Sequence, residues 1–120
     1  MSIIKSYKDL LVWQKGILVN EIYKIAAALP KAEQYILISQ MLRAAISIPS
    51  NIAEGYRRNH RGEYVQFLSI AISSAAELET QIIIAKNRYS SIEYQKAEML
   101  VGEIQKMFYS LISKMRAASA

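Results

Sequence analysis

The register of two residue stripes across Pro49 constrains the fold of this chain more than any other feature. Apolar residues recur at spacings of three and four on both sides of the proline, and polar residues recur likewise on a second face. A helix that broke at the proline would give the two halves no reason to keep one register. We therefore predict one helix over residues 32–58 that continues through Pro49 and bends there. The apolar stripe comprises Leu37, Met41, Ala44, Ala45, Ile48 and Ile52, and the polar stripe comprises Gln40, Arg43, Ser47, Asn51 and Glu54.

A proline inside a helix removes one backbone hydrogen bond, here the bond to the carbonyl of Ala45, at a cost of ~3 kcal/mol if nothing compensates. Ser47 and Ser50 flank the proline and are placed to bond backbone groups that it frees. The alternative is that two shorter helices meet at Pro49.

Three further segments show helical periodicity, which predicts an all-α, up-down-up-down four-helix bundle in a single domain over residues 1–120. Only 4 glycines and 2 prolines interrupt the 120 residues, so few, long elements are expected. Pro30 ends the first segment, and Ser90 with Glu93 has the spacing of a capping box that opens the last. The predicted helices cover residues 7–29, 32–58, 62–87 and 91–116.

The residue types argue against an enzyme, and we expect no catalytic residue, metal or cofactor. The chain has no cysteine, and its one histidine, His60, has no glutamate three residues before it, so the Glu-x-x-His pairs of di-iron bundles are absent. A glycine-rich phosphate loop is also absent. No signal peptide is evident, and the longest uncharged run, residues 64–76, is too short to span a bilayer. We expect a cytoplasmic protein with no membrane partner.

The densest positive cluster is the string "YRRNHR", which follows the second helix. It contains Tyr56, Arg57, Arg58, His60 and Arg61, in a chain whose net charge is +5. Arginines stay charged and a tyrosine ring can stack on a base, so these residues are candidates for nucleic-acid binding. The alternative is a solvated helix end, where cations complement the helix dipole.

The polar stripe of the second helix faces polar residues of the third if the two helices are antiparallel. That packing places Arg43 level with Glu77 and Glu79, and Gln81 belongs to the same region. The favoured interpretation is a structural network of Gln40, Arg43, Ser47, Asn51, Glu54, Glu77, Glu79 and Gln81, since a buried arginine requires a partner. The alternative is a groove for a ligand, in which Arg43 and Glu77 would line a small-molecule site.

Four strings carry a resemblance to a known family: "LLVWQKG", "IYKIAAALP", "SQMLRAAISIPSNIAEGYRR" and "FLSIAISSAAELETQIIIA". Together they resemble the four-helix-bundle proteins encoded by intervening sequences in bacterial 23S rRNA genes. The resemblance runs from Leu10 to Ala85, and the ungapped string "RAAISIPSNIAEG" is its most specific part. The positions it carries over are Trp13, Gln14, Pro30, Glu33, Gln40, Arg43, Ser47, Pro49, Asn51, Glu54, Gly55, Arg58, Glu77, Glu79 and Gln81.

The resemblance implies a ring-like homopentamer, a suspected nucleic-acid partner and no enzymatic activity. A 52% share of hydrophobic residues independently favours self-association, because a small monomer cannot easily hide so much apolar surface. The predicted function is therefore a non-enzymatic, oligomeric bundle that binds RNA or DNA through a basic rim. The alternative is a protein-interaction scaffold ring with no nucleic-acid role.

Overall fold

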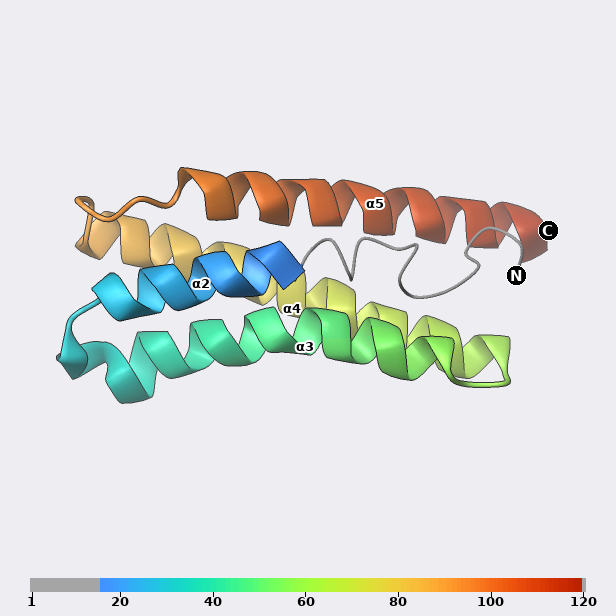
Figure 1. Cartoon of the computed structure of the whole chain (residues 1–120). Coiled ribbons are helices and arrows are strands. Elements are labelled where there is room, and N and C mark those ends of the chain that lie inside the picture. The colour runs from blue at the N-terminus through green and yellow to red at the C-terminus, as the bar shows by residue number, and fades with distance from the viewer. Residues whose placement is uncertain (1–15, 120) are drawn as a thin grey trace.

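The computed structural model describes residues 16–119, and every regular element in that range is helical (Figure 1). The predicted all-α four-helix bundle is confirmed. Consecutive long helices run in opposite directions in Figure 1. The elements are α2 (Gly16–Ala28), a 3-10 turn η1 (Lys31–Glu33), a π-helical turn η2 (Gln34–Ile38), α3 (Ser39–Tyr56), α4 (Arg61–Arg88) and α5 (Gln95–Ser119).

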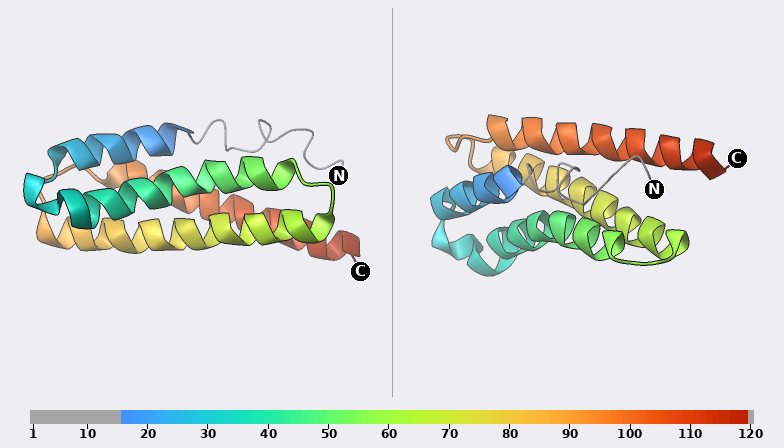
Figure 2. Two further views of the ribbon diagram at one scale, coloured as in Figure 1. Left: turned by 90° about the horizontal axis from the view of Figure 1, so that it is seen from below. Right: turned by 45° about the vertical axis from the view of Figure 1, so that its right-hand side comes forward.

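The bundle is elongated, with principal extents of 47 × 21 × 20 Å. α4 has 28 residues, which at ~1.5 Å per residue gives ~42 Å, so this helix runs almost the full length. α3 packs against α2 and α4, and α5 packs against α4 and α2 (Figure 2). The α3–α4 turn lies at one end of the bundle, and the α2–η1 and α4–α5 connections lie at the other.

The first helix stops where the sequence predicts. α2 ends at Ala28, two residues before Pro30, and the amide of Leu29 still donates to the Ile25 carbonyl at 3.0 Å. The predicted start at residue 7, together with Trp13 and Gln14, lies outside the described residues.

The second helix continues through Pro49, as the shared register of the two stripes predicts. The Ser50 hydroxyl donates to the Ile46 carbonyl at 2.8 Å, one residue beyond the carbonyl that the proline leaves without its helical donor. Ser47 is not used in this way, because its hydroxyl bonds across to α4. The bend at Pro49 stays a prediction.

The helical turns start at Lys31, one residue before the predicted boundary, and α3 ends at Tyr56 rather than at residue 58. The amides of Arg57 and Arg58 donate to carbonyls three residues back, those of Glu54 and Gly55. These tighter bonds end the α-helix early and turn the chain toward α4.

Gly55 is buried against α4, near the end of α3. A Cβ at this position would lie 2.8 Å from the Phe67 Cβ and 3.3 Å from both Cδ1 and the carbonyl oxygen of Tyr64. Because Gly55 has no side chain, α3 and α4 can pack this closely just before the turn.

The predicted start of the last helix at residue 91 is wrong, since α5 begins at Gln95 and continues to Ser119. Tyr94 is buried, and its hydroxyl lies 3.0 Å from the Ala85 carbonyl and 2.8 Å from the Tyr89 carbonyl. This anchor keeps the preceding residues in a loop. Glu93 accepts a hydrogen bond from the Gln95 amide at 2.5 Å, so it caps the helix from outside instead of forming a capping box with Ser90.

The core lies along the bundle axis, and small side chains line the contact between α3 and α4. Ala44 and Ala45 of α3 and Ala71 and Ala75 of α4 have no exposed surface, so the two backbones can approach closely. Larger side chains fill the remaining space: Leu18, Ile22, Met41, Ile48, Leu68, Leu78, Ile82 and Val101 are almost fully buried.

Two helical stretches, residues 31–56 and 61–88, are long and apolar enough to cross a membrane by length and composition alone. This indication is weak, because core helices of a soluble bundle pass the same test. Both stretches also carry charge at mid-length: Arg43 and Glu77 lie 3.9 Å apart across them.

Candidate functional site

The α3–α4 turn gathers the predicted nucleic-acid-binding residues at one end of the bundle (Figure 1). We call residues 56–61 the basic tip. Arg57, Arg58, His60 and Arg61 are exposed, and Tyr56 is half-buried. The end of α3 and the start of α4 hold these side chains, and the close packing at Gly55 fixes the turn between the two helices.

Arg58 is held against the surface by two contacts. Its guanidinium lies 2.7 Å from the Glu54 carboxylate, one helical turn earlier, and 4.8 Å from the centre of the Phe67 ring. Both members of the ion pair are substantially exposed, so the pair contributes at most ~1 kcal/mol to stability. Glu54 thus pairs with a residue of the basic tip, whereas the prediction placed it in the polar network.

Arg61 connects the basic tip to the last helix. Its guanidinium donates a hydrogen bond to the Met115 carbonyl, near the C-terminal end of α5. A helix C-terminus carries partial negative charge, which favours a cation there. Because the acceptor is a neutral carbonyl, Arg61 keeps its full charge.

A surface hollow of about 470 Å³ lies within the basic tip, and Gly55, Tyr56, Arg58, Asn59, His60, Arg61 and Tyr64 line it. The ring of Tyr64 is buried, and its hydroxyl has no hydrogen-bond partner in the described part of the chain. Burial, and to a lesser extent the nearby Tyr56, raise the pKa of Tyr64. Tyr64 therefore lines the hollow while its own hydroxyl is buried and unpaired.

Five of the eight residues of the predicted polar network form contacts along the α3–α4 seam, in two separate groups. Arg43 donates to Gln40 at 2.6 Å and lies 3.9 Å from Glu77. The hydroxyls of Ser47 and Ser74 are 2.7 Å apart, and the Asn51 amide donates to the Ser47 carbonyl at 2.8 Å and to its hydroxyl at 2.9 Å. This bonding supports the structural interpretation of the stripe over a ligand groove.

The remaining members lie elsewhere, and the expected burial of the arginine is wrong. Arg43 is 57% exposed, so its contact with Glu77 is a surface ion pair. Glu79 accepts a hydrogen bond from Gln105 of α5 at 3.3 Å. The Gln81 side-chain oxygen is buried, with no partner among residues 16–119.

The opposite end of the bundle contains an ion-pair cluster that the residue patterns did not indicate. Glu33 is nearly buried, accepts a hydrogen bond from the Tyr89 hydroxyl at 2.6 Å and lies 3.8 Å from Arg88. Only the family resemblance had singled out Glu33. These partners are more than fifty residues apart in sequence, so no local spacing could reveal the contact.

Lysines near that end are paired as well. Lys86 lies 3.3 Å from Glu98, and Glu21 lies 3.0 Å from Lys24 and 3.6 Å from Lys96. The hydrogen bond from Lys24 lowers the pKa of Glu21, and the charges of both lysines add to the effect. Four cations at this end are therefore paired with carboxylates, in contrast to the basic tip, and only Lys31 among the described cations here makes no ion pair.

The similarity to known proteins extends over the helices described above. Residues 8–111 match the family described as 23S rRNA-intervening sequence protein. The chain belongs to this family. The match extends beyond the resemblance seen in the sequence, because it includes most of α5.

A solved structure shares the fold. It is the 1.70 Å crystal structure of a protein of unknown function from the S23 ribosomal protein family of Bacteroides thetaiotaomicron. The two superpose with a TM-score of 0.76 at 21% sequence identity, over 86% of this chain and 98% of the other. No curated protein matches the chain.

Proposed function

We propose that this member of the family is a non-enzymatic cytoplasmic protein that forms a homo-oligomer and binds the phosphate backbone of RNA or DNA through the basic tip. The observation that carries the proposal is the unequal neutralisation of charge at the two ends. Lys24, Lys86, Arg88 and Lys96 each lie within 4 Å of a carboxylate. In the basic tip only Arg58 does so, and Arg57 makes no ion pair with any described residue.

The contacts within the basic tip leave it able to attract an anion. Exposed ion pairs are weak, so a phosphate can compete with Glu54 for Arg58. Arg61 bonds a neutral carbonyl, and Arg57 projects from an exposed turn. The guanidinium groups can present paired donors to phosphate oxygens, whereas nothing in this turn selects a particular base.

Self-association would strengthen the positive electrostatic potential of the basic tip. The family resemblance implies a homopentamer, in which each chain would contribute its arginines to one rim. Exposed apolar side chains on several elements support an oligomer. Ile36 is 64% exposed on η2, and Ile83 is 51% exposed on α4. Burial of such residues between chains would remove apolar surface from water.

The test compares two triple variants that remove the same charge. Arg57→Ala, Arg58→Ala and Arg61→Ala together should weaken binding of a labelled RNA or DNA, measured by fluorescence anisotropy at low salt. The matched control replaces Lys24, Lys86 and Lys96 by alanine at the opposite end. We expect the control to retain most of the affinity, and equal losses in both variants would refute a localised site.

The second candidate function is a scaffold ring that binds a protein partner. It is favoured by Tyr35, which is 85% exposed at the end of the bundle opposite the basic tip. The two candidates differ in one result: a scaffold remains oligomeric by light scattering yet binds neither RNA nor DNA at low salt.

A further inference from the structure

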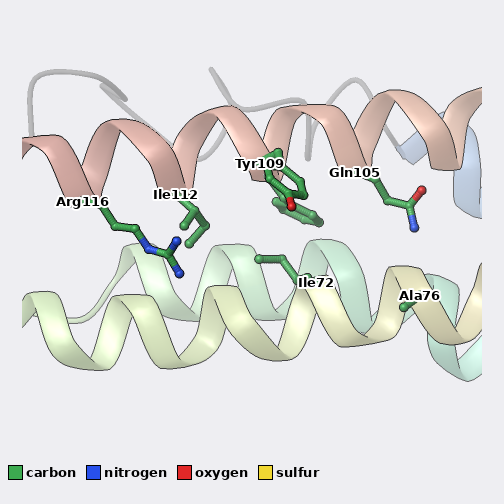
Figure 3. A pocket seen from close by; sticks show the side chains of 7 residues that line it. Ile72, Ala76, Gln105, Tyr109, Ile112 and Arg116 are labelled. Carbon is green, nitrogen blue, oxygen red and sulfur yellow. The ribbon is translucent and has the colours of Figure 1, made fainter.

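A groove runs along the outer surface between α4 and α5, outside the basic tip (Figure 3). Its volume is about 450 Å³, within the range of sites that hold small organic groups. Gln105 and Arg116 lie at its two ends with their polar groups directed toward α4, and Tyr109 lies between them. The lining residues are Ile72, Ala76, Gln105, Phe108, Tyr109, Ile112 and Arg116.

The groove combines an apolar floor with an exposed aromatic ring and a cation. Tyr109 is 84% exposed, although it follows the buried Phe108, so its ring is available for stacking. None of the lining residues is acidic, and the nearby carboxylate of Glu79 is engaged by Gln105 at 3.3 Å. Gln105 and Arg116 are separated by ~16 Å along α5 at 1.5 Å per residue.

This groove is joined to the basic tip through one contact. Arg61 lines the hollow of the basic tip and reaches across to the Met115 carbonyl on α5. The next residue, Arg116, lines the groove. Cationic side chains therefore continue from the α3–α4 turn onto the α5 surface, where the apolar floor begins.

We propose that the groove binds unpaired bases of a single strand of nucleic acid, with Tyr109 as the stacking platform and Arg116 and Arg61 along the phosphates. The inference rests on the proposed nucleic-acid function. It narrows the proposed ligand from any RNA or DNA to a strand whose base faces are exposed. In a duplex each base face is covered by its neighbours, so only an unpaired base can use the ring. The groove carries a cation and no acidic lining residue, so charge complementarity favours the anionic strand over an apolar segment of a second chain that has no acidic residue.

The test uses a tyrosine matched for exposure at the other end of the bundle. Tyr109→Ala and Tyr35→Ala remove rings that are 84% and 85% exposed. Binding of labelled single-stranded oligo(U) and oligo(dT), and of a blunt duplex of equal length, is measured by anisotropy. Tyr109→Ala should weaken single-strand binding by about five-fold to a hundred-fold while duplex binding changes less than two-fold. Tyr35→Ala should change neither, and Tyr109→Phe should retain single-strand affinity.

Arg116→Ala should also weaken single-strand binding, whereas Lys106→Ala, an equal charge change outside the groove, should have a smaller effect. If single-strand binding depends on the arginines of the basic tip but Tyr109→Ala and Tyr35→Ala behave alike, the groove proposal fails and the proposed function stands. If the wild-type chain binds no nucleic acid at low salt, both fail. A fall in molecular mass of Tyr109→Ala by light scattering would identify the groove as a contact between chains and overturn the proposal.

Discussion

Replacement of Gly55 by alanine tests how closely the two central helices approach. An added Cβ would lie 2.8 Å from the Phe67 Cβ and 3.3 Å from the Tyr64 carbonyl oxygen. Both atoms are fixed to the α4 backbone, so the contact can be relieved only if α3 and α4 separate near their turn. Overpacking of this kind costs ~2–3 kcal/mol, and the better helix propensity of alanine offsets ~1 kcal/mol. We expect a net loss of ~1–2 kcal/mol.

Gly102→Ala provides the matched control, since a Cβ there meets nothing within 4 Å in the interior of α5. It should stabilise the fold by ~0.5–1 kcal/mol. Urea unfolding followed by circular dichroism measures both, at one chain concentration because the stability of an oligomer depends on it. A Gly55→Ala variant as stable as the wild type, beside a stabilised Gly102→Ala, would refute the argument that this contact limits the approach of the helices.

Four further substitutions address other contacts. Tyr64→Phe removes a buried hydroxyl without a described partner and should leave the unfolding free energy unchanged or raise it. Tyr94→Phe loses the contacts that anchor the α4–α5 loop and should lower the unfolding free energy by ~0.5–1.5 kcal/mol in the same urea assay. Because Lys24 lowers the pKa of Glu21, this carboxylate stabilises the fold above its unfolded pKa of ~4.3, and the contribution is lost as pH falls through the lower folded value. Glu21→Gln should therefore reduce the loss of stability measured by acid titration below about pH 4.5. An acid titration identical to that of the wild type would contradict the pairing. Pro49→Ala restores a helical donor and should raise the unfolding free energy by ~1–2 kcal/mol, and a fall in stability would contradict this reasoning.

Residue periodicity was sufficient to predict the helices because apolar stripes record which face of each helix is buried. The shared register across Pro49 correctly predicted an uninterrupted α3, since burial on one face holds the helix together despite the missing bond. The start of α5 was missed because Tyr94 anchors the loop through the carbonyls of Ala85 and Tyr89, nine and five residues earlier, and no capping pattern signals such contacts.

The candidate site was predictable in position but not in detail. A basic run between two helices must lie in a turn, so Arg57, Arg58 and Arg61 were placed correctly at one end of the bundle. Which arginine is paired depends on side-chain reach: Glu54 is one turn from Arg58, while the Met115 carbonyl is supplied by a distant helix. The α4–α5 groove was missed for the same reason, since neither helix reveals it alone.

The dependence of nucleic-acid affinity on salt tests the central claim most directly. If the basic tip binds phosphates, the logarithm of the association constant should fall linearly with the logarithm of salt concentration, by ~0.7–0.9 per phosphate contacted. Replacement of Arg57, Arg58 and Arg61 by alanine should reduce that slope by about two or more. A slope unchanged by the three substitutions, or no binding by the wild type at low salt, would contradict the account.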